Sequence, residues 1–109
     1  MSREFIPDKR GLRDIPLRHN VYKSDEITVN DSAYTEITPD FDAELFDIYA
    51  VDGDILVKLT LPDDTESDEL KIPSGMGREE YLDYKKIKIK SVSGSATVIY
   101  YLSGYKLES

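Results

Sequence analysis

The sequence predicts an all-β domain of about six to eight short strands, arranged as a small antiparallel β-sandwich or a partly open barrel. From Glu26 onward, short runs of alternating apolar and polar residues are separated by turn residues roughly every 8 to 12 positions. Helical periodicity is almost absent from the same stretch. The length of 109 residues suits one domain with its own core.

Residues 1–24 are predicted to form an extended arm, and residues 25–109 the β domain. The arm contains Pro7, Gly11 and Pro16, and its apolar residues follow neither a helical nor a strand period. Its six bases and three acids give a net charge of +3. A disordered terminus is the alternative, but large apolar side chains among the bases favour an arm that becomes ordered on a partner. The arm residues predicted to bind that partner are Phe5, Ile6, Arg10, Arg13, Leu17 and Arg18.

Two short strands are expected first, at residues 26–30 and 33–38. The second ends at Pro39, because proline has no N–H to donate to a ladder. The strongest local signal is a hairpin over residues 44–61, in which two apolar runs flank an Asp-Gly pair. Since Asp-Gly tolerates positive φ, a type I′ turn is predicted there.

A charged loop follows at residues 63–69, with five carboxylates in seven residues. Clustered carboxylates are ligands that calcium accepts. However, the spacing of an EF-hand is missing and the loop contains no glycine that would allow a tight wrap. A solvated loop is therefore the preferred interpretation, with calcium binding as the alternative.

The C-terminal part is predicted to contain a short strand at residues 70–72 and a second hairpin over residues 85–102. This hairpin turns through residues 93–95, which read Ser-Gly-Ser. Between the two, residues 78–84 fit neither a helical turn nor a strand clearly, and a loop is predicted.

Charge is segregated along the chain. Residues 25–69 carry fifteen acids and one base, a net charge of −14, whereas residues 70–109 carry seven bases and four acids. Three of these bases, Lys86, Lys88 and Lys90, alternate along one predicted strand. The row they form is predicted to be a solvated face that protects an edge strand from unwanted pairing.

The composition argues against catalysis and against metal or cofactor binding. The chain has no cysteine and a single histidine, His19, so a thiolate nucleophile or a site with several histidines is excluded. His19 is expected to be exposed or at an interface. The net charge of −8 argues against a nucleic-acid partner. No apolar run is long enough for a signal peptide or a membrane span, so no membrane partner is expected.

Tyrosine is the remaining conspicuous residue type, with eight copies. Tyrosine is favoured where an apolar surface meets a wet rim, as it does at protein interfaces. Tyr81, Tyr84 and Tyr105 are predicted in or beside loops, and Tyr22 ends the arm. These four tyrosines are therefore candidates for partner binding.

Three segments resemble small structural proteins of tailed-bacteriophage particles. They are residues 51–57, the Ile-Pro-Ser-Gly connection at residues 72–75, and residues 87–101 with their Ser-Gly-Ser turn. The resemblance implies a non-enzymatic capsid decoration (cement) protein or head-fibre-like protein on the virion surface, present in the host cytoplasm during assembly. Its arm would bind the major capsid protein or another virion protein, and its β domain would self-associate, most simply as a trimer.

Other functions stay open on the sequence. The −14 segment suits an acidic inhibitor that mimics DNA, provided that its carboxylates form two spaced rows on one surface. A tail or neck accessory protein is a variant of the virion hypothesis. A carbohydrate-binding β module is suggested by the tyrosines, although the chain has no tryptophan for sugar stacking.

Overall fold

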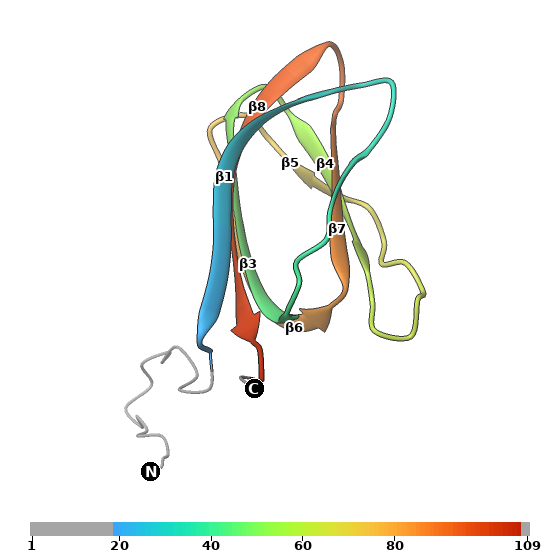
Figure 1. The fold of residues 1–109 in the computed structure, drawn as a ribbon. Coiled ribbons are helices and arrows are strands. Elements are labelled where there is room, and N and C mark those ends of the chain that lie inside the picture. Colours follow the sequence, from blue (N-terminus) through green and yellow to red (C-terminus); the bar gives the residue numbers. More distant parts are fainter. Residues whose placement is uncertain (1–18, 108–109) are drawn as a thin grey trace, which may run out of the picture.

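The protein is an eight-stranded antiparallel β-sandwich in a computed structural model that describes residues 19–107 (Figure 1). The strands are β1 (Val21–Asn30), β2 (Thr35–Ile37), β3 (Asp42–Asp52), β4 (Ile55–Thr60), β5 (Leu70–Ile72), β6 (Gly77–Tyr84), β7 (Lys86–Ser91) and β8 (Ser95–Tyr105). The first sheet, called sheet A, has the order β1-β8-β3-β6, and the second, sheet B, has the order β2-β7-β4-β5. The predicted all-β sandwich is thereby confirmed. The described residues contain no helix that could cross a membrane.

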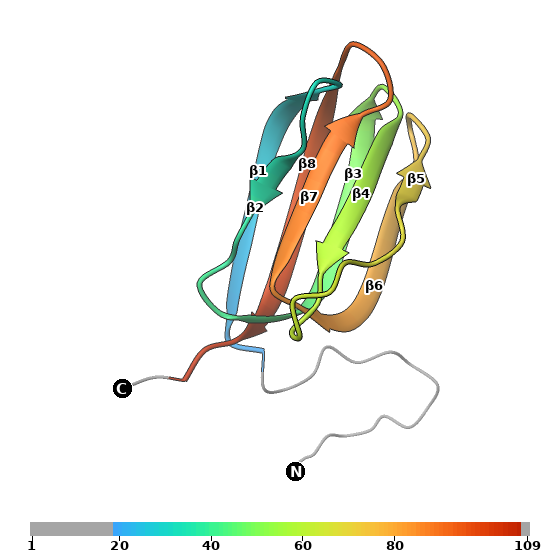
Figure 2. The ribbon, with the colours of Figure 1, turned by 90° about the vertical axis from the view of Figure 1, so that its right-hand side faces the viewer.

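Both predicted hairpins are wrong, because their strands belong to opposite sheets (Figure 2). β3 lies in sheet A and β4 in sheet B, and the same holds for β8 and β7. The connection at residues 52–54 is thus a corner between sheets. The predicted type I′ turn is also wrong, since Gly53 has a φ of 97° while Asp52 is not among the residues with positive φ. A Cβ on Gly53 would lie 2.9 Å from Ala96 Cβ, so this corner requires glycine.

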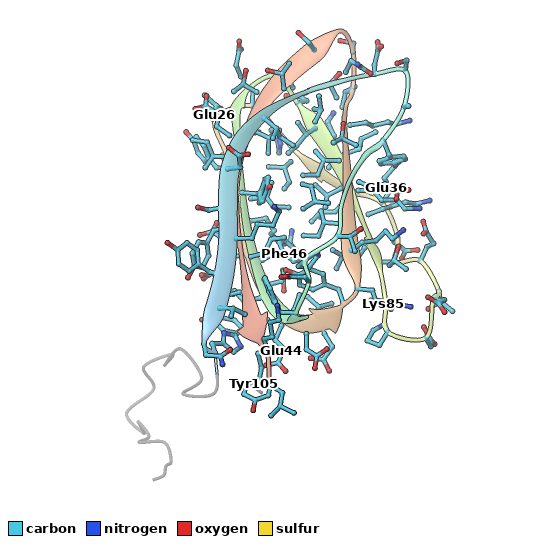
Figure 3. The ribbon with its side chains drawn as sticks, in the orientation of Figure 1. Glu26, Glu36, Glu44, Phe46, Lys85 and Tyr105 are labelled. Carbon is cyan, nitrogen blue, oxygen red and sulfur yellow. The ribbon has the colours of Figure 1, made fainter. Side chains whose placement is uncertain are left out.

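The core lies between the sheets and is built from alternating strand positions. Aliphatic and aromatic side chains from both sheets fill it, and Figure 3 shows Phe46 between the two layers. Fully buried members include Phe46, Ile48, Ile55, Ile87, Ile89 and Leu102. Tyr84 is 3% exposed, and its hydroxyl donates a 2.6 Å hydrogen bond to the Leu45 carbonyl. Burial raises the pKa of Tyr84 well above its ordinary value.

Two predicted element assignments change. Residues 78–84 lie in strand β6 rather than in a loop. The sequence does not show the alternation expected of this strand, because the charged residues Arg78 and Glu80 occupy positions that point between the sheets. Their register partners on β3 are the buried residues Ile48 and Phe46. Residues 21–24, which the charge pattern assigned to the arm, form the start of β1.

A β-bulge interrupts β3 between Ala43 and Leu45. Relative to β8, Glu44 is the extra residue, because Ala43 is opposite Gly104 and Leu45 is opposite Ser103. Figure 3 shows Glu44 and Tyr105 at the same end of the sandwich. Beside the bulge, the backbones of β3 and β8 approach closely at Gly104. A Cβ on Gly104 would overlap sterically with the Asp42 carbonyl oxygen and would lie 2.8 Å from Ala43 Cα.

The row of Lys86, Lys88 and Lys90 on sheet B is paired with acids and an aromatic ring, which differs from the solvated face predicted. Lys86 Nζ lies 3.1 Å from Glu36 Oε1, and Lys88 Nζ lies 2.8 Å from Glu66 Oε2. Lys90 Nζ lies 4.9 Å from the centre of the Tyr34 ring. The carboxylate of Glu66 comes from the acidic loop, so this loop folds over the basic row and partly neutralises it.

Acid is expected to loosen this loop. The hydrogen bond from Lys88 lowers the pKa of Glu66 below its ordinary value of 4.5, and a bond from Thr60 adds to the effect. A carboxyl whose pKa is lowered by folding stabilises the folded state above its unfolded pKa, and this stability is lost as the pH falls through the folded pKa. Glu66→Gln should therefore lower the melting temperature at pH 7 and flatten its fall below about pH 5.

The measurement is a set of thermal melts across the acidic range. Asp68→Asn removes another carboxylate of the same loop and serves as the control, because none of the ion pairs described for the basic row involves Asp68. Parallel pH profiles for Glu66→Gln and the unmodified protein would show that the Glu66 contacts do not stabilise the fold.

Candidate functional site

The sandwich is open along one long side, where the edge strands of the two sheets differ in length. β6 forms the edge of sheet A with eight residues, whereas β5 forms the edge of sheet B with three. β5 pairs only with Ile55–Val57 of β4. The remainder of β4 is flanked by the loop at residues 61–69 instead of a strand, as Figure 2 shows.

A cavity of about 290 Å³ lies at this open side, and we call it the edge cavity. Its floor is apolar and continuous with the core, formed by Phe46, Val57, Leu59, Leu70 and Leu82. Its rim is polar, formed by Ser67, Asp68, Arg78 and Glu80. A hollow with an apolar floor and a few polar groups at its mouth is the usual form of a small-molecule site.

The rim carries an ion pair on β6. Arg78 Nε donates to Glu80 Oε2 over 2.6 Å, and both side chains are close to half exposed. Since the two residues are on alternate positions of one strand, both point toward the gap between the sheets. Inward charges on an edge strand hinder pairing with other chains. Here they also place a cation and an anion at the mouth of an apolar cavity.

The opposite wall is held in place by hydrogen bonds from the loop to β4. Ser67 N–H donates to the Leu59 carbonyl, and the Ser67 hydroxyl accepts from the Leu59 N–H, each over 2.9 Å. Leu61 N–H donates to the Thr65 carbonyl over 2.8 Å. Residues 61–69 therefore form a fixed wall, and Asp68 beside Ser67 is brought to the cavity mouth.

A second hollow of about 330 Å³ lies at the end of the sandwich where β3 begins and β6 ends. Its lining mixes apolar residues with charged ones, including Asp40, Asp42, Lys85 and Lys86. Lys106 Nζ lies 3.1 Å from Asp40 Oδ2, and its hydrogen bond lowers the pKa of Asp40. This hollow lacks the apolar floor of the edge cavity and is the weaker candidate.

Of the sequence-predicted contact residues, the four that the structure describes, all of them tyrosines, are not among the lining residues of the edge cavity. Tyr84 is buried in the core, so its ring is not available for the partner contact that the sequence predicted. Tyr81 and Tyr105 are partly buried, and Tyr22 is 67% exposed on β1. The predicted arm residues Phe5, Ile6, Arg10, Arg13, Leu17 and Arg18 lie outside the described residues. The cavity residues were missed because Arg78 and Glu80 read as loop residues; their alternation with Leu82 was the available signal.

The His19 side chain is buried in the described fold, whereas the sequence predicted a histidine that is exposed or at an interface. Its side chain is 4% exposed, with Nδ1 3.0 Å from Ser103 Oγ and Nε2 3.1 Å from Glu44 Oε1. A serine, a histidine and a carboxylate in hydrogen-bonded sequence resemble a nucleophilic triad. However, Ser103 is 4% exposed near the C-terminal end of β8, where the strand is paired on both sides. The cluster therefore ties the start of β1 to the bulge of β3.

The donor set of the described residues does not suit a bound metal. Among residues 19–107, no three His, Cys, Asp or Glu side chains gather closely enough to hold a metal ion. The core between the sheets is built from aliphatic and aromatic side chains. Buried polar groups of this part of the chain include the hydroxyls of Thr60, Ser91 and Ser103, which are poor ligands for transition metals. They also include the His19 ring, whose two nitrogens already contact Ser103 and Glu44.

No protein-family model matches the chain, and no curated protein matches it. Solved structures do match. The chain is similar to the Cupin_2 domain of an XRE family transcriptional regulator from Enterobacter cloacae, with 14% identity, a TM-score of 0.54, and 79% of this chain and 83% of that chain covered.

Two further structures belong to an enzyme. Hydroxypropylphosphonic acid epoxidase from S. wedmorenis, in complex with fosfomycin, has 14% identity and a TM-score of 0.51, with 77% of this chain and 43% of that chain covered. The FeII form of HppE in complex with substrate has 14% identity and a TM-score of 0.54, with 87% and 59% covered. The present chain thus spans about half the length of these enzyme chains. In the part of the present chain that the structure describes, the interior does not offer the set of donors that an iron ion requires.

These similarities contradict the prediction of a virion structural protein. The matching structures are cupin-fold proteins, namely a regulator domain and an enzyme. The resemblance to phage proteins rested on residues 51–57 and 87–101, and both segments run through corners between the two sheets. Alternating strands around a polar turn occur in many β folds, so they do not identify one family. Self-association of the β domain stays a prediction.

The prediction of an acidic DNA mimic is wrong as well. Mimicry requires two spaced rows of carboxylates on one surface. The acids of residues 25–69 are instead divided between the faces, with Glu26 and Asp47 on sheet A and Glu36 on sheet B. Glu66 is already paired with Lys88. At these identities the comparisons show the fold alone: the chain is a cupin-like eight-stranded sandwich.

Proposed function

We propose that this protein binds a small molecule in the edge cavity and acts by binding rather than by catalysis. The single observation that carries the proposal is the opening of an apolar floor, continuous with the core, under a rim of charged side chains. The ligand is expected to have a compact apolar body and a polar head.

The size of the cavity limits the ligand. A volume of about 290 Å³ is at the lower end for ligand sites, so a chain or ring of about eight carbon atoms is the expected scale. Burying one methylene group contributes about 0.8 kcal/mol, so the apolar body would supply most of the affinity. The head would exchange its hydrogen bonds with water for bonds to Arg78, Glu80 or Asp68 at the rim.

The similar structures support ligand binding only by analogy. One enzyme structure holds fosfomycin and another holds substrate. Those complexes concern proteins that share only the fold with this chain, and the same fold hosts many functions.

The experiment is an NMR titration with octanol that follows the methyl signals of Leu59, Leu70 and Leu82. Leu82→Trp should fill the cavity and weaken octanol binding by about tenfold or more. Val92→Trp adds the same indole at an exposed turn outside the cavity lining, so it should leave binding unchanged. Thermal melts of both variants verify that they fold.

Two outcomes would overturn the proposal. One is the absence of methyl shifts at saturating octanol. The other is equal binding by the Leu82→Trp variant and the unmodified protein, because octanol would then lie elsewhere.

A further inference from the structure

The outer face of sheet A presents tyrosine rings and carboxylates in a regular grid. In one row across the sheet, Ser24 of β1 faces Tyr101 of β8, which faces Asp47 of β3, which faces Glu79 of β6. In the next row, Glu26, Ile99, Tyr49 and Gly77 follow in the same order. We call these two rows, together with Tyr22, the tyrosine face.

The aromatic part of this face is exposed and ordered. Tyr22 and Tyr101 stack with their ring centres 5.5 Å apart and an interplanar angle of 24°. Both rings are at least 40% exposed, as are Tyr49 and Ile99. Neighbouring strands lie about 4.8 Å apart, so the four side chains form one contiguous surface rather than scattered exposed residues.

The charges on the tyrosine face have one sign. Its carboxylates come from Glu26, Asp47 and Glu79, and none of its described positions holds a lysine or an arginine. Asp47 and Glu79 are direct register partners, and like charges placed opposite each other destabilise a sheet. In agreement with this, partial burial and the charge of Glu79 raise the pKa of Asp47.

The outer face of sheet B has the opposite character. Its strand positions include Lys58, Lys71, Lys86, Lys88 and Lys90, and Glu36 and Glu66 bind part of this row. The acids that accompany sheet B therefore compensate its lysines within the described fold. On the tyrosine face, Glu26 and Asp47 lie beside the exposed rings, and no position of its two rows holds a lysine or an arginine.

We propose that the tyrosine face binds an extended basic peptide segment of a partner protein, with arginine or lysine side chains over the tyrosine rings and between the carboxylates. Charge complementarity selects a cationic occupant, and tyrosine rings attract ammonium and guanidinium groups. Ile99 offers an apolar contact that a peptide can fill with an alternate side chain. This surface is on the outside of sheet A and is independent of the edge cavity.

The probe is a synthetic eight-residue peptide of alternating arginine and threonine, titrated into the full chain by calorimetry at low salt. Tyr101→Ala and Asp47→Asn should each weaken binding by about fivefold. Glu36→Gln, which removes an acid from the opposite sheet, should leave the affinity unchanged. A peptide with glutamate in place of arginine should not bind, and added salt should weaken the arginine peptide because exposed charges are screened.

Far-UV circular dichroism and thermal melts of each variant establish that the fold is kept, which is expected because these side chains are exposed. The proposal is overturned if the arginine peptide does not bind, or if it binds all variants with the same affinity. The second result would mean a non-specific attraction to a chain of net charge −8.

Discussion

Replacing Gly104 by alanine is expected to lower the free energy of unfolding by about 3 kcal/mol or more. An added Cβ would overlap sterically with the Asp42 carbonyl oxygen and would lie 2.8 Å from Ala43 Cα. Both neighbours are backbone atoms of β3, so neither can rotate away as a side chain does. Strands β3 and β8 would have to separate next to the bulge at Glu44. Urea unfolding followed by circular dichroism measures the change.

Gly75→Ala is the matched control for this substitution. Gly75 has a φ of 82°, but a Cβ added there would meet no atom within 4 Å. Its replacement should cost only the strain of a left-handed backbone, about 1 to 2 kcal/mol. Equal losses for both variants would show that loss of glycine flexibility, rather than the close approach of β3 and β8, sets the requirement at Gly104.

Replacing Phe46 by alanine is expected to cost about 3 to 5 kcal/mol of stability. The ring is 2% exposed and packs edge-on against Tyr84, with ring centres 6.1 Å apart and an interplanar angle of 78°. Phe46 also forms part of the floor of the edge cavity. Its removal therefore leaves a void that is open to the cavity, in addition to losing buried apolar area. Thermal and urea unfolding measure the loss.

Tyr49→Ala provides the comparison on the same strand. Tyr49 lies three residues further along β3 and is 43% exposed on the outer face. Removing its ring should cost less than about 1 kcal/mol, as exposed substitutions usually do. A loss for Phe46→Ala no larger than that for Tyr49→Ala would mean that the core relaxes to fill the space of the missing ring.

The sequence was sufficient for the fold class and most strands, but not for the topology. The alternation of apolar and polar residues at 55–60 and 95–102 indicates which side chains face a core, whatever the place of the strand in the fold. The alternation does not indicate which other strand is the neighbour. A tight Asp-Gly or Ser-Gly-Ser turn connects two strands equally well within one sheet or around the edge of a sandwich. The two corners were therefore read as hairpins.

The candidate site was hidden for a related reason. Arg78 and Glu80 lie on the core-facing side of an edge strand, where apolar residues are expected. Their charge therefore suggested a loop instead of strand β6. The pairing of Lys88 with Glu66 was equally invisible, since it joins a strand to a loop 22 residues away. Only the three-dimensional arrangement shows that the acidic and basic segments of the chain partly neutralise each other.

The pairing of the first strand with the last one constrains how the chain can fold as it is made. β1 is hydrogen-bonded to β8 over its whole length, from Val21 opposite Gly104 to Asn30 opposite Ser95. β8 lies between β1 and β3, so these two strands cannot become part of one sheet until residues 95–105 have left the ribosome. Contacts this distant in sequence close slowly because of the entropy of long loops. A nascent chain that stops short of β8 leaves the edges of β1 and β3 unpaired, and such edges are open to aggregation.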